Sequence, residues 1–67
     1  MELSARNQLK GKVTKITLGN VMAEVHLQVG ANELVSAITR GSAERLGIKV
    51  GDEVVAIIKA TEVLIGK

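Results

Sequence analysis

Hydrophobic and polar side chains alternate along much of the chain, and this alternation predicts β-strands. The clearest case is residues 21–29, where five apolar residues at odd positions alternate with residues that are mostly polar. A similar pattern runs over residues 9–14, with Lys10 and Lys12 on the polar face and Val13 on the apolar face. Both segments are therefore expected to be strands with one buried face.

Three further apolar runs predict strands at residues 34–38, 53–59 and 63–65. The run at 34–38 is apolar on both faces, so we expect it to be covered on both sides. Gly19-Asn20 favours a turn because both residues tolerate positive φ. Further turns are expected at residues 30–32 and 50–52.

Residues 39–47 break the alternation and predict one or two turns of helix. A hydroxyl residue precedes helix-forming residues, and Gly47 closes the segment. The N-cap is either Thr39 or Ser42. Five strands, with one short helix between the third and fourth, predict an all-β fold: a small five-stranded OB-like barrel formed by residues 1–67 as one domain. Closure of the barrel would remove the exposed strand edges.

The composition points to self-association. A chain of 67 residues has a small core, and there is no cysteine to add a disulfide. There is no aromatic residue either, yet 46% of the residues are hydrophobic. Apolar surface that a small core cannot accommodate is usually covered by a partner subunit. We therefore expect a homo-oligomer.

Residues that could perform catalysis or hold a free metal ion are missing. His26 is the only histidine, it has no cysteine or recognisable serine motif beside it, and we expect it to be a surface residue. The carboxylates are dispersed, and no glycine-rich phosphate loop is present. The sequence indicates neither an enzyme nor a site for a free cation. It also contains no membrane span or secretion signal, so a cytoplasmic location is expected.

Two clusters of hydrogen-bond donors, Ser4-Ala5-Arg6-Asn7-Gln8 and Lys59-Ala60-Thr61, lie near opposite ends of the sequence. A guanidinium offers five donors and keeps its charge, which suits an oxyanion. A solvated tail and an edge lysine that prevents sheet pairing are the simpler interpretations. Thr39 and Ser42 are most simply caps, although the start of a helix also binds anions. If the fold brings the two clusters together, they form an anion site.

Taken together, these segments resemble the molbindins, the small molybdenum-pterin-binding proteins made of one transport-associated OB (TOBE) domain. The resemblance runs from Ser4 to Ile65, and its most specific elements are the Ser-Ala-Arg-Asn-Gln start and the later Lys-Ala-Thr. It implies a homo-hexamer, arranged as a trimer of dimers, that holds molybdate or tungstate at subunit interfaces for storage or homeostasis. No reaction, nucleic acid or membrane is implied.

The resemblance also assigns residues to sites. In the main site Ser4, Ala5 and Arg6 come from one subunit. The neighbouring subunit contributes Thr39, Ser42, Lys59, Ala60 and Thr61. A second site, near the threefold axis, falls at Gly19, Asn20, Val21 and Met22. A chain without aromatic residues offers no stacking surface for a pterin, so the bare oxyanion is the expected ligand.

Two other functions stay open. An OB-type barrel can bind nucleic acid, but such barrels usually stack bases on aromatic residues, and nine basic residues offset by seven acidic ones make a poor phosphate track. The chain could instead be the anion-sensing domain of a larger regulator or transporter. Met1, directly before the first donor cluster, favours a free-standing protein.

Overall fold

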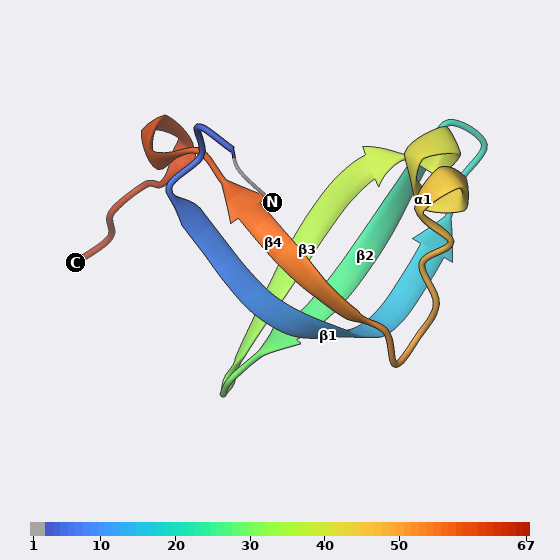
Figure 1. Cartoon of the computed structure of the whole chain (residues 1–67), viewed down its shortest axis with the longest axis horizontal. Helices are drawn as coiled ribbons and strands as arrows, with labels where there is room; N and C mark the ends of the chain where they lie inside the picture. The colour runs from blue at the N-terminus through green and yellow to red at the C-terminus, as the bar shows by residue number, and fades with distance from the viewer. Residues whose placement is uncertain (1–2) are drawn as a thin grey trace.

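Four antiparallel strands form one curved sheet, in the spatial order β3-β2-β1-β4 (Figure 1). The computed structural model describes residues 3–67, so Met1 and the expectation drawn from it lie outside the described residues. The strands are β1 (Asn7–Leu18), β2 (Met22–Val29), β3 (Asn32–Thr39) and β4 (Glu53–Ile58). The helix α1 (Arg40–Leu46) lies between β3 and β4, as predicted, and a 3-10 turn, η1 (Ala60–Glu62), follows β4.

The alternation predicted for β2 is confirmed. Ala23, Val25 and Leu27 are buried, whereas Glu24 and Gln28 are exposed. Removal of these apolar side chains from water is the main driving force for holding the strand against its neighbours.

The strand β1 follows the predicted alternation only as far as Val13. Val13 lies opposite Leu27 and Lys15 lies opposite His26, so β1 has one extra residue at this point. This bulge shifts the alternation, and Ile16 packs against the same core as Val13. A bulge also bends its strand, and β1 is strongly curved in Figure 1.

The turns occur where they were predicted, but one of them forms for a different reason. Gly30 has a φ of 59° and starts a two-residue hairpin loop, where a positive φ is needed. Neither Gly19 nor Asn20 has a positive φ. That turn is closed instead by the N–H of Gly19, which donates to the carbonyl of Met22 at 2.7 Å.

The structure decides between the two candidate caps of α1. Thr39 is the N-cap, because its backbone is extended (φ −70°, ψ 149°) and its hydroxyl accepts from the N–H of Ser42. Gly47 ends the helix in the left-handed conformation, with φ 62° and ψ 35°. Among residues 3–67 no helix is long and apolar enough to cross a membrane.

The predicted closed barrel is wrong for the single chain. The sheet is open, with β3 and β4 at its edges, and residues 63–65 form no strand. After η1 the chain extends away from the sheet (Figure 1), so no strand edge of the same chain lies beside this segment. The outer face of β3 is also uncovered, since Val35 is 51% exposed, which contradicts the expectation of cover on both sides.

Candidate functional site

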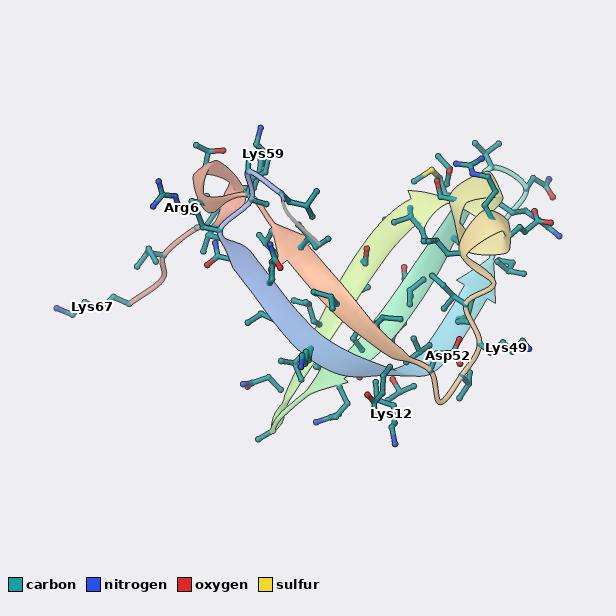
Figure 2. The ribbon with its side chains drawn as sticks, viewed as in Figure 1. Arg6, Lys12, Lys49, Asp52, Lys59 and Lys67 are labelled. Atoms are coloured by element: carbon teal, nitrogen blue, oxygen red, sulfur yellow. The ribbon has the colours of Figure 1, made fainter. Side chains whose placement is uncertain are left out.

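The two donor clusters meet at one end of the sheet. The first residue of β1, Asn7, lies opposite the last residue of β4, Ile58. Arg6 and Lys59 therefore lie at the same end of this strand pair, as Figure 2 shows. We call the group at this point the basic end. It comprises Ser4, Ala5, Arg6, Lys59, Ala60 and Thr61.

Local hydrogen bonds shape both segments of the basic end. On one side, the amide of Gln8 donates to the carbonyl of Ala5 at 3.3 Å. On the other, the N–H of Glu62 donates to the carbonyl of Lys59 at 2.9 Å and forms the turn η1. Five of the six residues are exposed, and Ala5 is half-buried. The donors thus face solvent on a backbone that is locally fixed.

No ion pair among the described residues neutralises the positive charges of the basic end. Among residues 3–67 the ion pairs join His26 to Glu24 and Glu33, and Arg40 to Glu44. None involves Arg6 or Lys59, so both cations are available to an anion.

Thr39 and Ser42 lie at the opposite end of the sheet. Thr39 pairs with Met22 at the far end of β2 and β3, where α1 begins. Its Oγ1 and the Oγ of Ser42 are 2.8 Å apart, and the N–H of Ser42 donates to Thr39 Oγ1 at 3.1 Å. The two hydroxyls form one compact polar group, which we call the hydroxyl pair.

The loop predicted to hold a second ligand, residues 19–22, lies beside the hydroxyl pair. The N–H of Arg40 donates to the carbonyl of Val21 at 2.8 Å, and its guanidinium donates to the carbonyl of Gly19 at 3.3 Å. Arg40 thereby ties this loop to the start of α1. The role of the loop in binding stays a prediction.

One chain therefore brings some of the predicted residues together and separates others. Lys59, Ala60 and Thr61 lie with Ser4, Ala5 and Arg6, whereas Thr39 and Ser42 are at the other end of β1, a strand of 12 residues. At about 3.3 Å per residue this strand is far longer than an oxyanion. A site that uses both groups needs two copies of the chain.

Two arginines close to the hydroxyl pair were not among the predicted site residues. Arg45 donates from Nη2 to the Oγ of Ser42 at 3.2 Å, and Arg40 contacts the loop described above. The spacing of Ser42 and Arg45 is i, i+3, which places two side chains on the same face of a helix. That spacing was the signal that could have identified Arg45.

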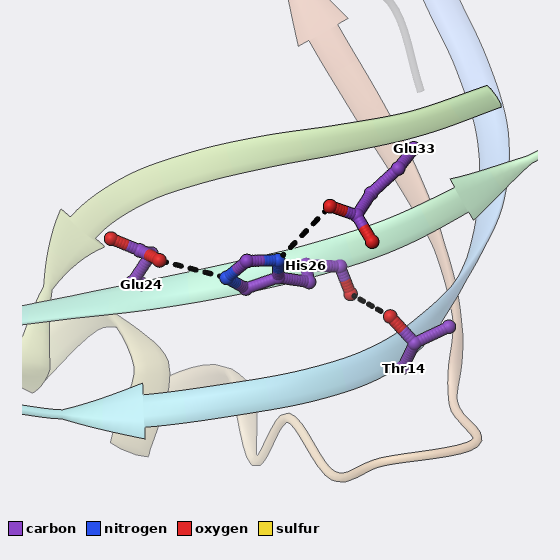
Figure 3. Close-up of polar contacts among 4 residues, drawn as sticks. All are labelled: Thr14, Glu24, His26 and Glu33. Atoms are coloured by element: carbon purple, nitrogen blue, oxygen red, sulfur yellow. Dashed lines mark hydrogen bonds and ion pairs between the residues drawn. The ribbon is translucent and has the colours of Figure 1, made fainter.

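His26 lies elsewhere, in a cross-strand network on the outer face (Figure 3). Its Nε2 is 2.7 Å from Glu24 and its Nδ1 is 3.4 Å from Glu33. Thr14 of β1 donates to the carbonyl of His26 at 3.3 Å. The contacts of His26 with Glu33 and Thr14 link β2 to β3 and to β1. No group of three His, Cys, Asp or Glu residues in the described part of the chain could hold a metal ion.

The concave face of the sheet contains an apolar groove of about 950 Å³. Its walls come from β2, β3 and β4 and from the segments after α1 and β4; they include Val25, Leu34, Ile48, Val54 and Val63. Few charged groups line it, so it suits apolar side chains rather than an oxyanion.

Comparison with known proteins agrees with this geometry. The family model of the TOBE domain matches residues 3–65. Molybdenum-pterin-binding protein 1 of Clostridium pasteurianum is 50% identical over 66 residues, which is 97% of each chain. A molybdate-binding protein from Sporomusa ovata superposes with a TM-score of 0.96 at 42% identity, over 100% of both chains.

A molybdate-bound form of ModG, described as a cytoplasmic molybdate-binding protein, is also similar. It superposes with a TM-score of 0.84 at 43% identity, over 90% of this chain and 43% of its own. The chain thus shares its fold with proteins that are described as molybdate-binding.

Proposed function

The chain belongs to the molbindins, the molybdenum-pterin-binding proteins of the TOBE domain family, and from this premise we propose that it binds molybdate or tungstate without catalysing a reaction. The observation that carries the proposal is the basic end, where two cations that form no ion pair among residues 3–67 lie on segments that also contain Ser4 and Thr61. The names of the relatives support molybdate as the ligand. An ion that is bound and released unchanged suits storage or homeostasis, which we assign to the cytoplasm by analogy with ModG.

The donors of the basic end match a tetrahedral dianion. Arg6 and Lys59 together carry the two positive charges that balance molybdate, and charge-assisted hydrogen bonds are the strongest kind available. The hydroxyls of Ser4 and Thr61, with nearby backbone N–H groups, can reach the remaining oxygen atoms. Sulfate has the same charge and shape, so the size of the cavity must discriminate between the two ions.

We place the complete site between two subunits. One chain contributes the basic end, and a second contributes Thr39 and Ser42. This division keeps Lys59 with Arg6, because β1 and β4 end side by side in one chain. It differs from the division that the resemblance implied, in which Lys59 came with Thr39. A shared ligand then stabilises the oligomer by mass action.

The exposed tail supports a homo-oligomer, which we propose to be a hexamer arranged as a trimer of dimers. Leu64 is 92% exposed and Ile65 is 90% exposed, although both are large and apolar. The sheet also has two open edges and an apolar groove. We propose that the tail of one chain covers the groove or edge of another, so that the missing strand is supplied across the interface.

Calorimetric titration of the purified protein with molybdate, tungstate, sulfate and phosphate tests the proposal directly. The expected result is tight binding of molybdate and tungstate and much weaker binding of sulfate and phosphate. Equal affinity for all four anions would leave only a general anion site. No measurable heat with molybdate or tungstate, at protein concentrations where the oligomer is intact, would refute the proposed function.

A further inference from the structure

Arg45 folds back along α1 toward the hydroxyl pair. Its Nη2 donates to the Oγ of Ser42 at 3.2 Å. Its Nη1 lies 3.6 Å from the position that a Cβ of Gly41 would occupy, so it passes over the glycine. Long side chains in helices lean toward the N-terminus, which is why a residue of the last turn reaches the first one.

The hydrogen bonds of the hydroxyl pair leave one proton unused. Thr39 and Ser42 have two hydroxyl protons between them, and one of these forms the 2.8 Å bond that joins the two oxygens. The other neighbours are the N–H of Ser42, which donates to Thr39, and the guanidinium of Arg45, which donates to Ser42. Both are donors only, so neither can accept the second proton. Whichever hydroxyl donates to the other, one O–H stays free for an acceptor outside this group.

Arg45 also differs in charge balance from the other arginine of α1. Arg40 is paired with Glu44 at 3.2 Å, whereas no ion pair among residues 3–67 includes Arg45. The hydroxyl pair therefore lies next to a guanidinium that no carboxylate of residues 3–67 neutralises.

We propose that Arg45 is a positioning residue for oxyanion binding. Ser42 Oγ accepts from both Thr39 and Arg45, so Arg45 occupies its second acceptor position and fixes the direction in which the free Ser42 proton can donate to the anion. This inference rests on the proposed function, because it concerns the half of the site that contains Thr39 and Ser42. It adds a residue that the motif resemblance does not contain.

The test measures molybdate affinity by calorimetry in Arg45→Gln, with Lys49→Gln as the matched control. Lys49 is also exposed and follows the same helix, but its backbone contacts Asp52 and its side chain makes no hydrogen bond to the hydroxyl pair. We expect Arg45→Gln to weaken binding about tenfold, the effect of losing one hydrogen bond to a charged group. Lys49→Gln should stay within about twofold of wild type.

A double-mutant cycle separates positioning from simple charge. If Arg45 acts through Ser42, Arg45→Gln should cause little further loss in a Ser42→Ala background. An equal loss in both backgrounds, a wild-type affinity for Arg45→Gln, or an equally large effect of Lys49→Gln would overturn the inference. The proposed function fails separately, if the wild-type protein itself does not bind molybdate. Thermal unfolding without ligand should be the same for Arg45→Gln and Lys49→Gln, which excludes a folding defect.

Discussion

At the scale of single residues, a cation serves an anion site only if its own chain leaves it unpaired. Arg40 shows the opposite case, because Glu44 and the carbonyl of Gly19 occupy its guanidinium. Arg6 and Lys59 make no ion pair with the described residues, and both are exposed. An exposed cation adds little to the stability of the fold, so its removal should affect binding far more than folding.

Replacing either cation of the basic end should therefore weaken molybdate binding selectively. We expect Arg6→Ala and Lys59→Ala each to cost about 2–4 kcal/mol of binding free energy, because each leaves a ligand charge unbalanced inside the interface. Calorimetry measures this cost. The free energy of unfolding without ligand, measured with denaturant, should be nearly the same as in the wild type. Lys67→Ala, at the far end of the tail in Figure 2, is the control for net charge. Near-wild-type affinity in both variants would refute the assignment of the basic end.

At the scale of elements, the sequence predicted what depends on local pattern and missed what depends on a partner. The alternation in β2 and the end of α1 at Gly47 could be predicted, and the N-cap was narrowed to Thr39 or Ser42, because burial and capping act within a few residues. The bulge at Thr14 was missed; its mark is the spacing of three between Val13 and Ile16, which interrupts the period of two. The predicted strand at 63–65 has the right residues, but one chain provides no edge beside it. In the candidate site, the sequence named the residues of the basic end but not their meeting in one chain, because that depends on the pairing of β1 with β4.

The close approach of β1 to the end of β2 requires a glycine at position 11. A Cβ at Gly11 would lie 2.9 Å from a methyl group of Val29 and 3.1 Å from the carbonyl oxygen of Gln28. Because a backbone atom is involved, Gly11→Ala should destabilise the fold by about 1–3 kcal/mol, the usual cost of overpacking. Gly66→Ala is the matched control, since nothing lies within 4 Å of its added Cβ.

Denaturant unfolding of both glycine variants, at one protein concentration, measures the difference. A fixed concentration is needed because the stability of an oligomer depends on it. If Gly11→Ala is as stable as Gly66→Ala, the close approach between β1 and the hairpin does not constrain this position.

At the scale of the whole molecule, the single chain lacks the predicted fifth strand, and its basic end and hydroxyl pair lie at opposite ends of the sheet. We propose that a second copy of the chain supplies the missing partner in both cases. The tail of one chain can cover the groove of another, and the basic end of one chain can meet the hydroxyl pair of another. Assembly and ligand binding would then depend on the same interfaces, so that each stabilises the other.

The tail gives the first test of this dependence. Leu64→Ser combined with Ile65→Ser removes the two most exposed apolar side chains of the described chain. We expect the variant to sediment as smaller species than the wild type at the same concentration, because the apolar contribution to the proposed interface is lost. Lys67→Ala should leave the oligomer intact. An unchanged sedimentation coefficient in the double variant would show that the tail does not hold subunits together.

The last test concerns the division of the site between chains. If the basic end and the hydroxyl pair come from different chains, Lys59→Ala and Ser42→Ala should complement each other after they are unfolded, mixed and refolded together. Random pairing at independent interfaces gives an intact site at roughly a quarter of positions, since each half is wild type with a probability of one half.

Mixing Lys59→Ala with Arg6→Ala should restore nothing, because both residues belong to the same end of one chain and every basic end then carries a defect. Recovery of tight molybdate binding in the second mixture but not in the first would instead place Lys59 with Ser42, on the chain opposite Arg6.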